Sequence, residues 1–167
     1  MSQSDPDNWQ SWLARHRAAL FLMARQYLST REEAEDAVHD GFVKFWKSRS
    51  SARDPAAYLF TCVRSAAYDL RRAHAARSRY ETSPFAPSAS FLESPVEQDE
   101  RRRHVEAALA QLPQDQREVL VLKIWSTLTF AQIAEVLQIP LNTAASRYRY
   151  ALQNIEPLLA KEFKNDA

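Results

Sequence analysis

The side chains most suited to chemistry in this sequence lie near its end, between Thr129 and Leu152. Hydroxyl and guanidinium groups recur there on one side of a predicted helix, and such groups bind phosphates and the edges of bases. The residues on that side are Thr143, Ser146, Arg147, Arg149 and Tyr150. The same spacing occurs in an ordinary helical hairpin with solvated arginines, so periodicity alone leaves DNA binding and a structural hairpin both open.

Two short helices joined by a tight turn must position these side chains. Thr129 and Gln132 form a capping-box pattern, and apolar residues follow them at helical spacing. Pro140 cannot continue that helix, and Asn142 is a suitable N-cap for the next one. A helix-turn-helix presents the first turns of its second helix to the major groove of DNA. Gln138 stands where the turn of such a motif usually has glycine.

A second group of polar side chains follows a capping pattern at Thr30. Asp36, His39 and Asp40 share one exposed face of the predicted helix. Acidic residues near a helix start also complement the helix dipole, so this face is either a structural feature or an acidic docking surface for a partner helix. A catalytic or metal-binding pair of carboxylates has little support, because no second acidic pair or HExxH-like element accompanies it.

The helix predicted after Asp54 and Pro55 carries aromatic and hydroxyl side chains, followed by an arginine-rich end. We predict these groups to be exposed, where they would stack unpaired bases and follow a nucleic-acid backbone. The candidate residues are Tyr58, Thr61, Ser65, Tyr68, Arg71 and Arg72. Core tyrosines on a solvated basic helix would give the same pattern, and this alternative stays open.

The composition predicts an all-α protein. One glycine and eight prolines among 167 residues argue against a glycine-rich phosphate loop. The single cysteine, Cys62, excludes an internal disulfide and fits a small core residue, and the four histidines show no metal-ligand spacing. We therefore expect no metal site, no cofactor and no enzyme activity. No stretch approaches the roughly 20 apolar residues of a membrane-spanning helix, so we expect a cytoplasmic protein without membrane insertion.

A Pro/Ser-rich, aperiodic segment, residues 78–94, divides the chain into two small helical domains. We predict a three-helix domain over residues 5–77 and a helix-turn-helix domain over residues 95–160, joined by this flexible linker. The first helix should end near Ser29, and Pro157 should end or kink the last one. Apolar positions at helical spacing predict buried side chains that include Trp46, Ile124, Trp125 and Leu152.

Three blocks in a fixed order resemble a sigma factor of bacterial RNA polymerase, of the small extracytoplasmic-function type within the sigma-70 family. AEDAVHDGFVKFWK resembles the core-polymerase-binding helix of that family, whose usual pattern is AED-x-x-Q-[ED]-x-F-x-x-x-W. DPAAYLFTCVRSAAYDLRR resembles its promoter-melting helix, and LPQDQREVLVLKIWSTLTFAQIAEVLQIPLNTAASRYRYAL resembles its helix-turn-helix. The resemblance covers almost all of the chain except the linker and both ends, and its specificity comes from the order of the blocks.

The resemblance implies a function by binding. The N-terminal domain would bind the clamp helices of the largest subunit of core RNA polymerase and capture unpaired bases of the downstream promoter element. The C-terminal domain would contact the upstream promoter DNA and the polymerase flap, and an anti-sigma factor is a further expected partner. The implied polymerase-binding residues are Asp36, His39, Asp40 and Val43. The implied upstream-promoter residues add Asn142 and Ala145 to the five named above.

Four positions depart from the family pattern. The usual docking glutamine is His39, and a frequent asparagine near the base pocket is Ser65, which lacks the paired donor and acceptor of an amide. Asn142 replaces a frequent glycine and Ala145 a frequent lysine or arginine, which removes one expected DNA contact. The promoter sequence is therefore not implied. Two alternatives stay open: a stand-alone helix-turn-helix regulator that needs no polymerase, and a degenerate sigma-like adaptor that does not read DNA.

Overall fold

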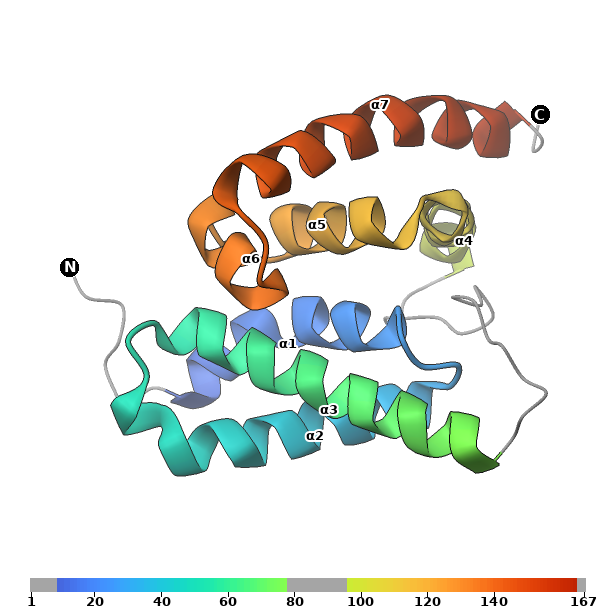
Figure 1. Ribbon diagram of the computed structural model, residues 1–167. Helices are drawn as coiled ribbons and strands as arrows, with labels where there is room; N and C mark the ends of the chain where they lie inside the picture. Colours follow the sequence, from blue (N-terminus) through green and yellow to red (C-terminus); the bar gives the residue numbers. More distant parts are fainter. Residues whose placement is uncertain (1–8, 78–95, 165–167) are drawn as a thin grey trace.

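The computed structural model describes residues 9–77 and 96–164, and every regular element in these ranges is helical (Figure 1). The N-terminal domain consists of α1 (Trp9–Arg25), α2 (Arg31–Ser48), the short 3-10 helix η1 (Arg49–Ser51) and α3 (Pro55–Arg77). The C-terminal domain consists of α4 (Val96–Gln111), α5 (Gln114–Trp125), α6 (Phe130–Leu137) and α7 (Leu141–Lys164). The prediction of an all-α fold with two helical domains is confirmed, while the predicted linker lies outside the described residues. None of the described helices is both long and apolar enough to cross a lipid bilayer.

Three helices begin where the sequence places their caps. The Thr30 hydroxyl and the Asp54 carboxylate each accept a hydrogen bond at 3.2 Å from the amide three residues further on. At α6 the capping box is complete. The Gln132 backbone N–H donates to the Thr129 hydroxyl at 3.2 Å, and the Gln132 side-chain oxygen accepts from the Thr129 backbone N–H at 2.8 Å. Each cap provides a partner for backbone N–H groups that the first helical turn leaves unpaired.

Close packing of α2 on α3 holds the N-terminal domain together. Gly41 makes it possible, because a Cβ at this position would lie 2.5 Å from the Cα of Val63 and 2.7 Å from its backbone nitrogen. Phe45, one turn further along α2, is fully buried, as is Ala67 on α3. A side chain at Gly41 would therefore push the two helix backbones apart.

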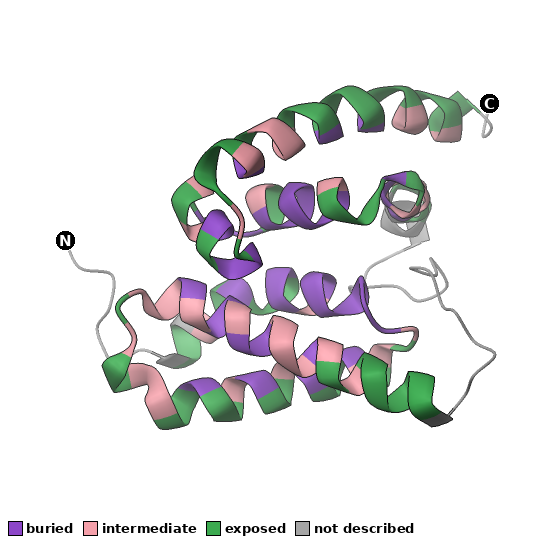
Figure 2. Cartoon of the chain, in the orientation of Figure 1, coloured by how far each residue is buried: buried purple, intermediate pink, exposed green. Residues whose placement is uncertain are grey.

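The two domains pack against each other around α5. Residues 117–122 in the middle of this helix are all buried, because α1, α6 and α7 contact it from different sides. Helix α6 also contacts α3, so one cluster of buried apolar residues includes Leu20 and Val63 of the N-terminal domain and Val119 and Ile133 of the C-terminal domain. Figure 2 shows that the middle of α5 and the second half of α1 are buried, whereas the outer side of α7 is exposed.

The first helix is shorter than predicted. It ends at Arg25 and not near Ser29. The reason is the buried Arg25 guanidinium, which donates a hydrogen bond at 2.6 Å to the carbonyl of Leu28 and holds the chain in a turn. A charged side chain that is removed from water requires such a partner, and helical spacing alone does not reveal it.

Helix α7 differs from the prediction at both ends. Asn142 is not its N-cap, because the helix begins at Leu141, two residues before the start that an Asn142 cap predicts, and the Ala144 backbone amide donates its helical hydrogen bond to the Pro140 carbonyl at 3.0 Å. Pro140 precedes the first helical residue, so its missing N–H removes no hydrogen bond from the helix. Pro157 does not end α7, which continues to Lys164, beyond the predicted domain limit at residue 160, because its last turns pack against α4.

Four apolar side chains predicted to be buried are partly exposed. The exposed fractions are 38% for Trp46, 51% for Ile124, 38% for Trp125 and 41% for Leu152. Helical spacing identifies the apolar side of a helix but not its width or its length. Ile124 and Trp125 lie in the last turn of α5, beyond the buried residues 117–122, while Trp46 and Leu152 lie at the edges of the buried sides of α2 and α7.

Candidate nucleic-acid interface

The outer face of α2 carries the first group of predicted site residues. These residues are Asp36, His39, Asp40 and Val43, and all four are exposed. They lie on the side of the helix opposite to Gly41 and Phe45, which pack toward α3. We call the four residues the outer α2 face; its exposure agrees with the prediction, and its role as a docking surface stays a prediction.

Trp46 extends the outer α2 face and was assigned to the core by sequence reasoning. Its indole ring lies one helical turn beyond Val43, and the Arg49 guanidinium covers one side of it, 3.5 Å from the ring centroid. Such a cation over an indole is an electrostatically favourable contact. The signal that would have found Trp46 is its spacing of three and seven residues from Val43 and His39.

The predicted single-strand site on α3 is half-buried and not exposed. The Tyr58 ring lies 5.9 Å from an aromatic ring of α2, and the Thr61 hydroxyl donates to the carbonyl four residues before it at 2.9 Å. Ser65 is also half-buried, whereas Arg71 and Arg72 are exposed. The predicted exposure is wrong for the aromatic and hydroxyl residues, because α2 covers one side of α3 and the C-terminal domain covers another, and it is right for the two arginines.

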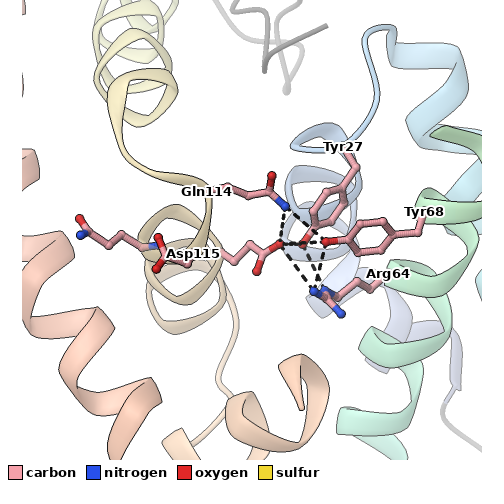
Figure 3. Close-up of polar contacts among 7 residues, drawn as sticks. Tyr27, Arg64, Tyr68, Gln114 and Asp115 are labelled. Atoms are coloured by element: carbon pink, nitrogen blue, oxygen red, sulfur yellow. Dashed lines mark hydrogen bonds and ion pairs between the residues drawn. The ribbon is translucent and has the colours of Figure 1, made fainter. Parts of the chain in front are cut away.

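Tyr68, the last aromatic residue of that series, points toward the C-terminal domain (Figure 3). Its hydroxyl donates to the Glu118 carboxylate of α5 at 3.4 Å and accepts from the Gln114 amide at 3.3 Å. The Tyr27 hydroxyl donates to the same Glu118 oxygen at 2.6 Å, and the Arg64 guanidinium lies 3.7 Å from it. We call Tyr27, Arg64, Tyr68, Gln114 and Glu118 the Glu118 cluster.

The surroundings of the Glu118 cluster raise the pKa of both tyrosines. Burial raises the pKa of Tyr27 well above its usual value, and the Glu118 carboxylate raises it further because it opposes a negative phenolate. Burial and then Glu118 also raise the pKa of Tyr68. Both hydroxyls are therefore protonated donors at neutral pH, as the hydrogen bonds to the carboxylate require.

A second polar contact joins α3 to the helix-turn-helix. The side-chain amide of Gln132 donates to both carboxylate oxygens of Asp54, at 3.0 and 3.3 Å. Each of these residues also caps its own helix, so the contact joins the start of α3 to the start of α6. Together with the Glu118 cluster, it holds the start and the middle of α3 against the C-terminal domain.

The predicted recognition helix α7 lies at the outside of the molecule, on the side away from α2 (Figure 1). Exposed positions are Asn142, Ala145, Arg149 and Tyr150, and half-buried positions are Thr143, Ser146 and Arg147. The Arg149 guanidinium lies 5.4 Å from the centroid of the Tyr150 ring, and the Arg147 guanidinium lies 3.7 Å from the Asp115 carboxylate. Neighbouring side chains therefore orient both cations on a surface that reaches solvent.

The turn before α7 depends on one residue in the left-handed region. Gln138 has φ 54° and ψ 50°, and no other non-glycine residue in the described ranges has positive φ. The Gln138 backbone N–H donates to the Glu135 carbonyl at 3.3 Å, and the Ile139 backbone N–H donates to the Ala134 carbonyl at 3.0 Å. These two bonds form a Schellman motif, in which glycine is the usual left-handed residue. The turn of a helix-turn-helix is thus retained with glutamine in the glycine position.

Cys62 is buried, as predicted, and burial raises the pKa of its thiol. Among the described residues, no three His, Cys, Asp or Glu side chains gather in a way that would hold a metal ion. The exposed polar positions of α2 and α7 are suited to binding macromolecules, whereas the Glu118 cluster lies between the two domains.

Comparison with known proteins decides the family. Residues 12–77 match the family model of sigma-70 region 2, and residues 102–155 match that of sigma-70 region 4. The ECF RNA polymerase sigma factor SigL of Mycobacterium tuberculosis is 30% identical over 145 residues, which cover 83% of this chain and 81% of the relative. The chain belongs to the sigma-70 family as an extracytoplasmic-function (ECF) sigma factor. The sigma factor SigK of a Mycobacterium species (strain KMS) is 28% identical over 168 residues, with 95% of this chain and 86% of the relative covered.

Solved structures share the fold of this sigma factor. The sigma factor RpoE from Bartonella quintana, in complex with the anti-sigma factor NepR, aligns with a TM-score of 0.71 at 23% identity, over 92% of this chain and 97% of that one. CnrH, in complex with the cytosolic domain of CnrY, aligns with a TM-score of 0.63 at 23% identity, over 95% and 91% of the two chains. The resemblance inferred from the three sequence blocks is confirmed, and the chain is a sigma factor that directs transcription initiation.

Sequence reasoning missed four of the five members of the Glu118 cluster, all except Tyr68. Tyr27 and Arg64 lie in the matched region 2, and Gln114 and Glu118 lie in the matched region 4. The available signal was weak: Glu118 follows Asp115 by three residues and directly precedes an apolar run in α5, and Arg64 precedes Tyr68 by one helical turn. Nothing in the spacing indicates that the two residues meet.

Proposed function

We propose that this sigma factor acts in the cytoplasm by binding and not by catalysis. It docks on core RNA polymerase through the outer α2 face, and it engages both elements of one promoter through α3 and α7. The observation that carries the proposal is that regions 2 and 4 occur in the family order on one chain, with exposed candidate surfaces on both.

The outer α2 face supports docking on polymerase. The carboxylates of Asp36 and Asp40 are exposed beside the apolar side chains of Val43 and Trp46. An apolar patch with charged groups at its rim is the usual composition of a protein interface. The acidic groups favour a basic partner, and the clamp helices of the largest polymerase subunit are the expected one.

Helices α3 and α7 support promoter binding. Arg71 and Arg72 at the end of α3 are exposed and can follow the backbone of an unpaired strand. Arg147 and Arg149 on α7 suit the phosphates of the upstream duplex, in a salt-dependent contact. Because one polymerase would hold both domains on one promoter, each weak contact raises the effective concentration of the other.

An anti-sigma factor is a further partner that we propose. RpoE and CnrH, which share the fold of this chain, were each solved as complexes, RpoE with the anti-sigma factor NepR and CnrH with the cytosolic domain of CnrY. A sigma factor with the same two-domain fold offers a comparable surface. Copurification of the chain from its own cells, followed by identification of the bound protein, would test this partner.

The first experiment is capture of purified bacterial core RNA polymerase by the full chain, with Asp36→Arg plus Asp40→Arg as the test variant. We expect the double substitution to weaken binding at least tenfold, because it reverses the charge of the outer α2 face. A matched control is Glu100→Arg plus Glu156→Arg, which reverses two exposed carboxylates elsewhere. Failure of the intact chain to bind polymerase would favour a stand-alone regulator.

A second experiment separates promoter reading from an adaptor role. Arg147→Ala plus Arg149→Ala should reduce transcription in a reconstituted assay and leave polymerase capture unchanged, because it removes two phosphate contacts. The control variant, Arg101→Ala plus Arg103→Ala, removes two exposed arginines of α4. Full transcription by the first variant would support the adaptor and contradict DNA reading through α7.

A further inference from the structure

The buried charges of this sigma factor gather where its two domains meet. Among the described residues, the buried arginines and glutamates are Arg25, Glu106, Arg117 and Glu118. Arg25 of α1 interacts electrostatically with Glu106 of α4, and Arg117 interacts with the neighbouring Glu118 of the same helix. A permanent core seldom buries charges, because each needs a partner once water is removed. The contact between the domains therefore combines a shared apolar cluster with buried charged groups, which become hydrated if the domains separate.

Glu118 obtains most of its partners from the other domain. Tyr27 and Tyr68 donate hydrogen bonds to its carboxylate at 2.6 and 3.4 Å, and the Arg64 guanidinium lies 3.7 Å away. Within its own domain, Gln114 donates to it at 3.2 Å. The side chain of Glu118 is only 7% exposed, so its charge is stabilised in this position by the N-terminal domain.

The groups that Glu118 occupies are suited to a nucleic-acid strand. The Arg64 guanidinium lies 4.8 Å from the centroid of the Tyr68 ring, and both residues belong to α3, where the proposed function places unpaired promoter DNA. A guanidinium beside an aromatic ring binds a backbone phosphate while the ring stacks a base. The Arg64 guanidinium donates hydrogen bonds to the Tyr27 and Tyr68 hydroxyls at 3.3 and 3.2 Å, and its contact with the Glu118 carboxylate is an ion pair. A strand phosphate beside Arg64 would meet the negative charge of Glu118, so Glu118 and a DNA strand compete for this place.

We propose that Glu118 is an intramolecular competitor of single-stranded promoter DNA. In the free protein its carboxylate forms an ion pair with Arg64 and accepts a hydrogen bond from Tyr68, and separation of the domains removes these two contacts so that the strand can replace them. Arg64 is thereby assigned as a further single-strand contact. The hydrogen bond from Gln132 to Asp54 joins the two domains at the start of α3, and it also favours the closed arrangement. The inference rests on the proposed role of α3.

The test uses the full chain with Glu118→Gln, which keeps the shape of the side chain and removes its charge. The radius of gyration is measured by small-angle X-ray scattering, and the affinity for a fluorescently labelled single-stranded oligothymidylate by anisotropy. We expect both to rise, the affinity about tenfold, because a site that is occupied internally for about nine-tenths of the time binds about tenfold more weakly. Glu156→Gln, at an exposed position of α7, should change neither.

Adding Arg64→Ala to Glu118→Gln should remove the gain in affinity and leave the chain expanded. A folded Glu118→Gln chain with unchanged radius of gyration and unchanged affinity for the oligothymidylate would overturn the proposal. An expanded Glu118→Gln chain whose affinity does not rise would overturn it as well. If circular dichroism shows that Glu118→Gln does not fold, Tyr27→Phe takes its place. It removes the 2.6 Å hydrogen bond, keeps the ring, and must shift both quantities in the same direction for the proposal to stand.

These measurements contain no polymerase, so they are read independently of the docking proposal. Polymerase capture that is insensitive to Asp36→Arg plus Asp40→Arg would contradict docking through α2 and leave the competition result intact. Polymerase capture that is lost in that variant, combined with no effect of Glu118→Gln on DNA binding, would retain the docking and reject the competition.

Discussion

Where α2 packs on α3, the helices approach so closely that Gly41 has no room for a Cβ beside Val63. Where the N-terminal domain meets α5, the polar groups include the buried side chains of Glu118 and Tyr27 and the half-buried Arg64 guanidinium. Separating an apolar contact exposes hydrocarbon to water, whereas separated polar groups exchange their hydrogen bonds for bonds to water. The contact between the domains also includes apolar residues of both, such as Leu20 and Ile133, so its opening exposes hydrocarbon as well. On the proposed competition, its polar groups become hydrated when the two domains move apart, while the N-terminal domain stays folded.

The strongest way to break this comparison is to place a side chain between α2 and α3. Gly41→Val should lower the free energy of unfolding of the N-terminal domain by about 3 kcal/mol, because the helix backbones must separate to admit it. Thermal denaturation followed by circular dichroism measures the loss. The control is Lys44→Val, at an exposed position of the same helix, which should change stability by less than about 1 kcal/mol. A Gly41→Val chain as stable as the wild type would contradict the close approach.

Alkaline pH should open the contact between the domains before it affects the contact between α2 and α3. Closure of the two domains raises the pKa of Tyr27 above its value of about 10 in an open chain. The stability that Tyr27 gives to the closed arrangement is therefore fully present below about pH 10, and it is lost as the pH rises through the raised pKa. The loss is about 1.4 kcal/mol per pH unit in that interval. Small-angle scattering between pH 8 and pH 12 should show an expansion.

The matched control for the alkaline transition is Tyr27→Phe, which has no phenol to ionise at that position. Its expansion should depend less steeply on pH, with Tyr68 as the remaining tyrosine of the cluster. Identical pH profiles for the wild type and Tyr27→Phe would show that Tyr27 does not control the contact.

The smallest effect is expected at an ion pair that lacks burial. Arg31 and Glu35 are 3.0 Å apart on α2, but their side chains are 41% and 52% exposed. Arg31→Ala should therefore change the free energy of unfolding by no more than about 0.5 kcal/mol. Denaturation in urea measures this difference. A loss above about 2 kcal/mol would mean that burial is not what distinguishes the Glu118 cluster from surface ion pairs.

Local chemistry made much of the fold predictable. The caps at Thr30, Asp54 and Thr129 act over three residues, so the starts of α2, α3 and α6 could be located from sequence. The family was identified because three blocks occur in one order. The exposure of Asp36 and Asp40 followed from helical spacing, since the opposite side of α2 is uniformly apolar or small.

Long-range packing explains what the sequence did not reveal. Tyr27 and Glu118 are 91 positions apart, and no periodicity reports a contact at that separation. Helical spacing puts Arg64 and Tyr68 on one side of α3, but it does not say whether solvent or a second domain covers that side. For the same reason Trp46 was assigned to the core, because the edge of an apolar stripe is set by the neighbouring helix.

The closed arrangement covers the middle of α3 and leaves the outer α2 face and the outer side of α7 exposed. Stacking and phosphate contacts to unpaired strands are largely indifferent to sequence, and cellular RNA offers both in great excess over melted promoters. On the proposed assignments, the single-strand site on α3 is the least selective surface of the protein, and it stays covered until polymerase has bound the sigma factor. Transcripts would then compete poorly for the free sigma factor, and recruitment would precede strand capture in time.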